Sequence, residues 1–453
     1  MLEANIKPNR KAVLVSVQTP DVSDEELHSS LAELQRLCET LGYEVVGTLT
    51  QKRKSPSPAT AVGEGKLKEL ARWTGGTGKV ATYSGGSTFD EDEADADEPE
   101  TFEDEDDEPK VLAGKIVFDQ ELTPNQLKHL EEATGAEVLD RTGVIVEIFS
   151  RHAKTREAKA QVEIARLKYL APRLRATGQR ADRQGGGIGG KGAGETTYEL
   201  DKRRSRDRVA ELQEELKHIR ADHLQRRDRR QSQISVALVG YTNAGKSSLM
   251  RALTGNEVLV ADKLFATLDT TVRALQPDHF PRTLISDTVG FIQKLPHDLV
   301  ASFRSTLDEA ADATLLLYVV DSSDPGFRQQ LEVTQTVLKE IDAGAIPSLL
   351  ILNKADCLDV VQTSLLTREF PDAILMSARI PADVEKLKRI IREHVTKDLK
   401  EAEVLVPYDD KTGLLGDIRR SASVTHEQFE EKGVRLTIRT YPETLAKLRL
   451  TPK

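Results

Sequence analysis

The chain has 453 residues, enough for about three domains. Hydrophobic residues make up 38% of it and charged residues 30%, which excludes collagen-like, disulfide-rich and wholly disordered chains. Its two cysteines, Cys38 and Cys357, are far apart and have no metal-binding spacing. No apolar run approaches the roughly 18 residues of a transmembrane helix. We therefore expect a cytoplasmic protein without a membrane span.

A low-complexity acidic tract produces much of the net charge of -10. Residues 90–108 hold fourteen acids and no lysine or arginine, and without these acids the chain would carry +4. Such a tract cannot build a core, so we expect a disordered insertion at about 84–110. Two roles stay open for it: a solvated spacer, or a mimic of RNA that inhibits the protein.

The first region, about 1–150, alternates strand and helix signals. The apolar run Ala12–Val17 predicts a strand, and the segment from Asp24 to Leu37 predicts a helix with leucines on one face. Glu44–Thr50 predicts the next strand, and similar strand and helix pieces follow as far as Phe149, among them Pro124–Thr134. This alternation is typical of an α/β domain with a parallel sheet.

Residues of about 151–233 show long charged helical patterns and no strand signal. Helices are predicted over Glu157–Leu174 and Tyr198–Gln231, and Gly-rich residues 185–194 would join them into a hairpin. The second helix has a seam with steps of three and four, as in a coiled coil: Val209, Leu212, Leu216, Ile219 and His223.

The second of these helices is basic. Residues 201–231 contain eleven lysines and arginines against seven acids. Four of the basic residues form a cluster: Arg226, Arg227, Arg229 and Arg230. A cluster of this kind is either a solvated face or a contact to nucleic acid.

From Ile234 to about residue 400 the alternation of strand and helix returns. Strands are predicted at Ile234–Val239, Thr283–Ser286, Thr314–Val320, Ser348–Leu352 and Ala373–Met376. Residues 401–453 predict short strands around helical pieces, a small α+β domain. The predicted fold is thus α/β in four parts: an N-terminal α/β domain (1–150), a helical hairpin (151–233), a mostly parallel sheet with flanking helices (234–400) and the small C-terminal domain.

The clearest motif fits the P-loop pattern GxxxxGK[ST]. It consists of Gly240, Tyr241, Thr242, Asn243, Ala244, Gly245, Lys246 and Ser247. It follows an apolar strand and opens a helix that continues with Ser248, the context that a P-loop requires. Backbone N–H groups of such a loop form a nest for phosphates. We expect Lys246 to reach the β- and γ-phosphates and the Ser247 hydroxyl to ligate Mg²⁺.

Two later segments should complete the phosphate site. Asp287 begins a DxxG motif and would hold the Mg²⁺ shell, while the Gly290 N–H would sense the γ-phosphate. A threonine between the P-loop and this motif must reach Mg²⁺, and by position we choose Thr271 over Thr270 and Thr267. The expected catalytic residues are therefore Lys246, Thr271 and Gly290.

The remaining motifs predict the base. In the NKxD motif, which begins at Asn353, Asp356 can accept two hydrogen bonds from guanine N1–H and its exocyclic amine, a pair of donors that adenine lacks. Lys354 would lie over the base. Ser377, Ala378 and Arg379 would complete the base pocket. The order and spacing of the motifs predict GTP and GDP as ligands.

Two other glycine-rich runs resemble parts of a P-loop. Gly185–Lys191 is followed by Gly192 and lacks the hydroxyl for Mg²⁺, and Gly63–Lys66 lacks the spacing. We interpret both as flexible loops.

Beyond these motifs, the chain resembles HflX, a family of ribosome-associated GTPases related to Obg. The matching stretches are 62–67, 121–126, 139–142, 161–165, 167–174, 185–189, 265–269 and 287–292. The acidic insertion, Thr270 in place of a usual Pro, and Arg379 in place of a common Lys depart from the family pattern. The departures at 270 and 379 leave nucleotide binding intact.

The resemblance implies a GTPase, expected to be a monomer, that binds the large ribosomal subunit and splits or rescues stalled ribosomes. The N-terminal domain and the hairpin would face ribosomal RNA. Two alternatives stay open: a GTPase switch of another class with no RNA role, and a GTP-binding scaffold that does not hydrolyse GTP.

The residue after DxxG predicts slow hydrolysis. Ras-like GTPases place a glutamine there to orient the attacking water, and this chain has Phe291. Asn243 matches the asparagine that ligates K⁺ in TrmE-related GTPases, and a K⁺ could supply the charge of an arginine finger. Alternatively, Asn243 only caps the loop. We expect the ribosome to complete the site by ordering the segment around Thr271.

Overall fold

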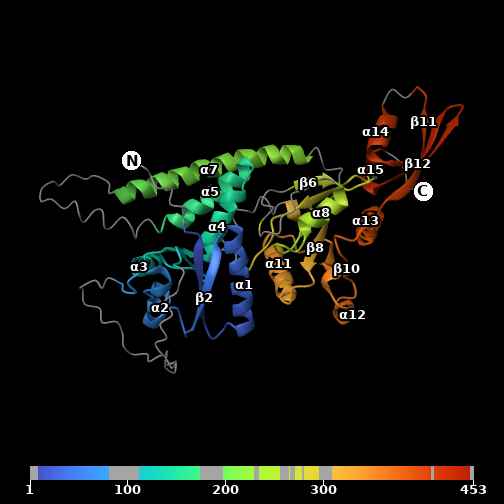
Figure 1. Ribbon diagram of the computed structural model, residues 1–453. Coiled ribbons are helices and arrows are strands. Elements are labelled where there is room, and N and C mark those ends of the chain that lie inside the picture. The colour runs from blue at the N-terminus through green and yellow to red at the C-terminus, as the bar shows by residue number, and fades with distance from the viewer. Residues whose placement is uncertain are drawn as a thin grey trace, which may run out of the picture. The chain divides into compact units, whose positions relative to one another are not determined.

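The computed structural model describes residues 9–80, 112–173, 197–228, 234–255, 265, 271–277, 280–294, 309–409 and 413–448. The chain forms two compact units: Met1–Leu216 with Leu295–Ser302, and Lys217–Lys294 with Phe303–Lys453 (Figure 1). The predicted acidic insertion and the run 185–191 lie outside the described residues, as do the side chains of the four clustered arginines. No helix in the described ranges is both long and apolar enough to span a membrane.

A parallel sheet with strand order β2-β1-β3-β4 forms the core of the N-terminal part of the first unit. This confirms the predicted α/β layout. The strands are β1 (Lys11–Gln18), β2 (Glu44–Lys52), β3 (Lys115–Phe118) and β4 (Glu137–Asp140). The helices that accompany them are α1 (Asp24–Thr40), α2 (Glu64–Thr74), α3 (Pro124–Thr134) and α4 (Arg141–His152).

The interpretation of Gly63–Lys66 as a flexible loop is wrong. Gly63 is the N-cap of α2, and the three residues after it are helical. Glycine is acceptable at an N-cap because the position needs extended rather than helical backbone, and Gly63 has φ -75° and ψ 167°. The apolar face of α2, with Leu67 and Leu70, is buried in the core and stabilises the helix.

Two long helices follow, α5 (Arg156–Leu170) and α7 (Thr197–Asp228). The predicted seam of the second helix packs on the first: Leu212 and Leu216 form an apolar cluster with Ala160 and Ile164. Two ion pairs flank this cluster. Arg208 Nε lies 2.8 Å from Glu163 Oε1, and Arg156 pairs with Glu215.

A buried carboxylate joins α5 to the sheet. Asp140, at the end of β4, accepts hydrogen bonds from the Gly143 N–H at 2.8 Å and the Tyr169 hydroxyl at 2.8 Å. Arg173 Nη2 donates to its other oxygen at 2.6 Å, and the Leu122 N–H donates there at 3.2 Å. Asp140 is fully buried, so these donors replace the water that a carboxylate requires.

The second unit contains a six-stranded sheet with the order β10-β9-β8-β5-β7-β6. Its strands are β5 (Ile234–Val239), β6 (Thr271–Ala274), β7 (Thr283–Asp287), β8 (Leu315–Asp321), β9 (Ser348–Asn353) and β10 (Ile374–Leu375). All neighbours are parallel except β6 and β7. The mostly parallel sheet that we predicted is confirmed.

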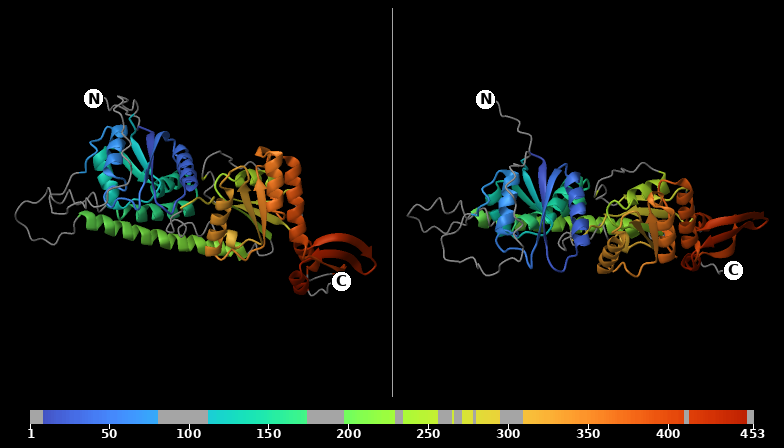
Figure 2. Two further views of the ribbon diagram at one scale, coloured as in Figure 1. Left: turned by 90° about the horizontal axis from the view of Figure 1, so that it is seen from below. Right: turned by 60° about the horizontal axis from the view of Figure 1, so that its bottom comes forward.

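Helices cover both faces of this sheet (Figure 2). α8 (Lys246–Thr254) and α13 (Pro381–Thr396) share one apolar cluster with the sheet. α11 (Phe327–Glu340) and α12 (Val360–Glu369) share another. Because these strands are parallel, their carboxyl ends lie at the same edge of the sheet. Ligands bind at this edge in folds of this kind.

A small antiparallel sheet with order β11-β13-β12 ends the described chain. Its elements are β11 (Lys400–Pro407), α14 (Leu414–Ser421), β12 (Ser423–Glu430), β13 (Gly433–Thr440) and α15 (Pro442–Lys447). The Tyr441 hydroxyl donates to the Val395 carbonyl of α13 at 2.6 Å, which anchors this sheet to the preceding helix.

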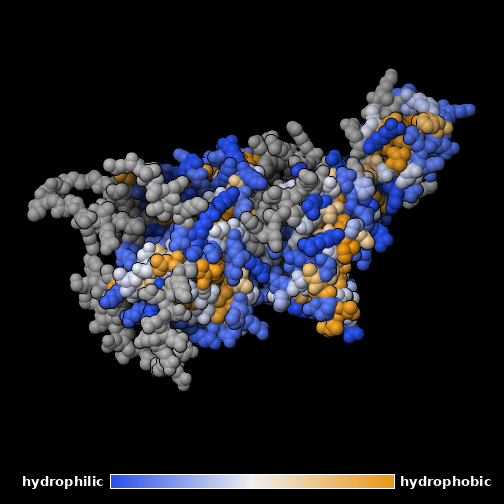
Figure 3. Space-filling model, viewed as in Figure 1, coloured by the Kyte–Doolittle hydropathy of each residue, from blue (hydrophilic) through white to orange (hydrophobic). Residues whose placement is uncertain are grey.

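Exposed apolar side chains gather on α12 (Figure 3). Val360 is 86% exposed, Val361 67% and Leu365 58%. Contiguous exposed apolar groups are typical of surfaces that contact another molecule.

Two glycines in first turns of helices should respond oppositely to alanine. A Cβ on Gly143 would lie 2.5 Å from the Tyr169 hydroxyl oxygen, so Tyr169 would have to leave Asp140. We expect Gly143→Ala to lower the free energy of unfolding by about 1–3 kcal/mol. A Cβ on Gly65 meets no atom within 4 Å, so Gly65→Ala should raise it by about 0.5–1 kcal/mol. Thermal unfolding of the two variants measures this, and shifts in the same direction would contradict it.

Candidate nucleotide-binding site

The loop between β5 and α8 leaves no room for side chains at its two ends. Gly240 has φ 147°, and a Cβ there would lie 2.1 Å from the Val319 carbonyl oxygen. Gly245 has φ 94°, and its Cβ would lie 2.2 Å from Asn353 Nδ2. Both positions therefore require glycine, because the backbone conformation and the neighbouring atoms each exclude a side chain.

Lys246 opens α8 and is buried beneath the loop. Its Nζ donates to the carbonyl oxygens of Gly240 at 3.0 Å and Tyr241 at 2.8 Å. Burial lowers the pKa of this ammonium group to about 8, although nearby Asp287 opposes the shift. The loop thus holds a cation whose charge a bound phosphate would stabilise.

Ser247 and Asp287 meet beside Lys246. The Ser247 hydroxyl donates to Asp287 Oδ2 at 2.8 Å. Thr271, the first residue of β6, pairs with Asp287 in the antiparallel register, while Thr267 and Thr270 lie outside the described residues. A carboxylate and a hydroxyl are hard oxygen donors, so this pair fits Mg²⁺, which binds few protein groups and keeps phosphate oxygens and water as its other ligands.

The DxxG segment pairs with the P-loop through the backbone. The Thr242 N–H donates to the Phe291 carbonyl at 2.8 Å, and the Phe291 N–H donates to the Gly240 carbonyl at 3.2 Å. The Gln293 N–H donates to the Tyr241 hydroxyl at 2.6 Å. Phe291 is only 2% exposed. Its position is thus fixed by packing and by backbone pairing.

Gly290 lies against the P-loop. A Cβ there would meet Thr242 Cγ2 at 2.7 Å and Lys246 Nζ at 3.0 Å. A side chain at this position would therefore collide with Thr242 and crowd the Lys246 ammonium group.

The NKxD segment connects the Ser377–Arg379 loop to the P-loop. Asn353 Nδ2 donates to the Ala244 carbonyl at 2.9 Å, and Asn353 Oδ1 accepts from the Ala378 N–H at 3.0 Å. Lys354 Nζ lies 2.6 Å from Asp321 Oδ2. Sequence reasoning missed Asp321, whose only signal is an acid at the carboxyl end of a strand.

Asp356 faces the Ser377–Arg379 loop. A hydrogen bond from Ser377 is the main cause that lowers its pKa, and Arg379, whose Nη1 lies 3.8 Å away, contributes in the same direction. Asp356 is therefore ionised at neutral pH and able to accept hydrogen bonds. The Ser377 hydroxyl also accepts from the Arg379 N–H at 3.2 Å, which holds the loop closed.

Three protein-family models match successive parts of the chain. They are described as GTP-binding GTPase N-terminal (residues 28–81 and 107–150), GTP-binding GTPase Middle Region (152–230) and 50S ribosome-binding GTPase (235–354). The chain is 53% identical to GTPase HflX of Gluconacetobacter diazotrophicus over 97% of each chain. The chain belongs to the HflX GTPase family.

A more distant HflX supports the same assignment. GTPase HflX of Caldanaerobacter subterraneus is 36% identical over 99% of this chain and 95% of its own. A GTP-binding protein of Sulfolobus solfataricus in complex with GDP is 24% identical, with a TM-score of 0.42 over 86% and 99% of the two chains. Membership in the HflX family makes the chain a GTPase and confirms the resemblance that the motifs indicate.

The buried Lys246 predicts a pH dependence of nucleotide affinity in this HflX protein. With a pKa of about 8 in the free protein, the amine loses its proton as the pH rises from 7 to 9. Bound phosphates favour the ammonium form, so binding takes up a proton and the affinity for GDP should fall, by at most about tenfold per pH unit.

Titration of labelled GDP at pH 7, 8 and 9 measures this effect. Guanine itself loses a proton in alkali, so Lys246→Arg is the control, because its guanidinium stays charged. An affinity of the wild type that does not change with pH would contradict the prediction.

Proposed function

We propose that this HflX-family GTPase binds the large ribosomal subunit through RNA and changes its affinity with the bound nucleotide, so that it dissociates or rescues stalled ribosomes. The match of residues 235–354 to a model described as 50S ribosome-binding GTPase is the observation that carries the proposal. A GTPase switch without an RNA role would not require the basic side chains on α5 and α7.

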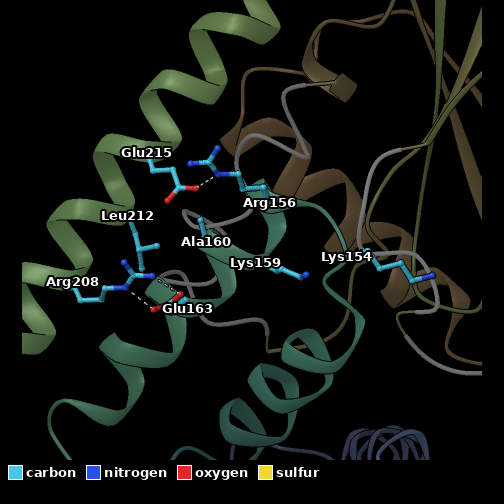
Figure 4. A pocket seen from close by; sticks show the side chains of 8 residues that line it. All are labelled: Lys154, Arg156, Lys159, Ala160, Glu163, Arg208, Leu212 and Glu215. Carbon is cyan, nitrogen blue, oxygen red and sulfur yellow. Dashed lines mark hydrogen bonds and ion pairs between the residues drawn. The ribbon is translucent and has the colours of Figure 1, made fainter.

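A basic hollow between α5 and α7 supports an RNA contact (Figure 4). It has a volume of about 370 Å³ and is lined by Lys154, Arg156, Lys159, Ala160, Glu163, Arg208, Leu212 and Glu215. The two arginines pair with the two glutamates across the hollow. The lining as a whole holds four basic side chains against two acidic ones. Phosphates of RNA bind to such surfaces in a salt-dependent way.

At the nucleotide, the proposal assigns each motif one task. The P-loop backbone (Gly240 to Ser248) and Lys246 would bind the phosphates, and Asp356 would select guanine. Ser247, Asp287 and Thr271 would hold Mg²⁺, which when bound supplies positive charge beside the phosphates. Lys246 would stabilise the charge that develops during phosphoryl transfer.

Water activation is the step for which the DxxG segment offers no side chain. Phe291 has no hydrogen-bonding atom beyond its backbone, and that backbone is already bonded to the P-loop. We infer that intrinsic hydrolysis is slow and that the ribosome completes the site by ordering the segment around Thr271.

Asn243 offers a place for K⁺ in the P-loop. It is exposed with a φ of 60°, and no hydrogen bond of its side chain is found within the described residues. A K⁺ bound there would add positive charge near the phosphates. The backbone hydrogen bonds that join Gly240 and Thr242 to Phe291 do not involve the Asn243 side chain.

Co-sedimentation with ribosomal subunits tests the proposed partner. We expect more protein on large subunits with a non-hydrolysable GTP analogue than with GDP. Lys159→Glu should weaken binding and reduce the log–log salt slope by about 0.7–0.9 for each phosphate that is no longer neutralised. Lys386→Glu, which changes another exposed lysine on α13, is the control. Ribosome association that changes with neither the bound nucleotide nor the salt concentration would favour a GTPase switch of another class. A lack of multiple-turnover phosphate release would favour a GTP-binding scaffold.

GTP turnover in K⁺ and in Na⁺ at equal ionic strength tests the monovalent site. Wild type should hydrolyse faster in K⁺, with a further increase on large subunits, because both add to transition-state stabilisation. Asn243→Ala should lose the preference for K⁺, while Asn125→Ala, which changes an exposed asparagine on α3, should retain it. Equal rates of the wild type in the two salts would exclude the K⁺ site.

A further inference from the structure

The end of β8 is tied to the start of the NKxD motif. In the parallel register of β8 and β9, Asp321 pairs with Asn353. The next residue, Ser322, donates to the Asn353 carbonyl through its N–H at 3.0 Å and its hydroxyl at 2.6 Å. The backbone that carries Lys354 is therefore fixed to the strand that carries Asp321.

Both carboxylate oxygens of Asp321 have partners. Oδ2 accepts from Lys354 Nζ at 2.6 Å, and Oδ1 accepts from the Ser323 N–H at 3.1 Å and its hydroxyl at 2.6 Å. The Asp321 side chain is 16% exposed and that of Lys354 30%. Partial burial makes this ion pair less screened than a surface pair.

Lys354 has an unfavourable backbone conformation for a residue with a side chain. Its φ of 62° and ψ of 31° lie in the left-handed region, where glycine is the easiest residue to place. Strained residues of this kind cluster at ligand clamps, where their side chain has a task. Glycine here would relieve the strain but lose the ion pair with Asp321.

We propose that Asp321 is a positioning residue for recognition of the guanine base. By holding Lys354 in the free protein, it spares the nucleotide the entropy cost of ordering a long flexible side chain. That cost corresponds to about a two- to tenfold loss of affinity when the restraint is removed. The inference rests on the proposed placement of Lys354 over the base.

A double-mutant cycle on labelled GDP tests the inference. Asp321→Asn and Asp321→Ala should raise the dissociation constant two- to tenfold, mainly through faster dissociation. In a Lys354→Ala background the same changes should have no further effect, because their target is gone. Asp324→Asn is the matched control: Asp324 lies in the same loop but accepts from Gly326 and Gln330.

Inosine diphosphate lacks the exocyclic amine of guanine. It therefore distinguishes an effect on contacts to the face of the base from an effect on hydrogen bonds to its edge. The Asp321 variants should weaken GDP and inosine diphosphate by the same factor, since Lys354 would act on the face. The role of Asp321 would be overturned if its variants lost the same factor of GDP affinity in the wild-type and the Lys354→Ala backgrounds. Unchanged GDP affinity in Asp321→Ala would also overturn it. A wild type that does not prefer GDP to ADP would instead overturn the proposed base site. Thermal unfolding of Asp321→Asn, which keeps an acceptor for Ser323, checks that folding is retained.

Discussion

The side chain of Asn353 holds the P-loop and the Ser377–Arg379 loop at a fixed spacing. Its amide donates to the Ala244 carbonyl in the P-loop and accepts from the Ala378 N–H. Asn353 is 2% exposed, so both hydrogen bonds are shielded from water. A buried amide without a hydrogen-bond partner costs about 1–3 kcal/mol of stability. A nucleotide that spans the two loops would meet a site whose length is set before binding.

Buried charges play the corresponding part in the first unit. Asp140 ends β4 and accepts a hydrogen bond from Tyr169 of α5, and the next residue in the chain is Arg141. Arg141 is 2% exposed and pairs with Glu33 of α1 and with Asp119, which follows β3. Loss of Arg141 would remove the cation that both buried carboxylates contact, at a cost of about 3–5 kcal/mol. Two adjacent residues thus fix the packing of α1, β3, α4 and α5.

Local patterns in the sequence predicted most of the elements. The apolar run Ile234–Val239 is a buried strand with those bounds, and Pro124–Thr134 is a helix whose Thr123 and Gln126 form a capping box. These signals are local, because capping and periodicity depend on residues only a few positions apart. The prediction of a flexible loop at Gly63–Lys66 was wrong because glycine was interpreted as a loop signal. The burial of Leu67 in the core stabilises a helix there.

The sequence by itself determined the motifs that we propose for the nucleotide site, because each motif carries its donors and acceptors within three to eight consecutive residues. Only the tertiary structure decided which residues support those motifs. The pairs Asp321–Lys354 and Asp140–Arg173 join positions 33 residues apart and have no periodic signal. Burial of Phe291 against the P-loop is likewise a result of strand order, since β5 and β7 become neighbours only in the folded sheet. Contacts between distant segments follow from topology, and a single sequence does not record them in any local pattern.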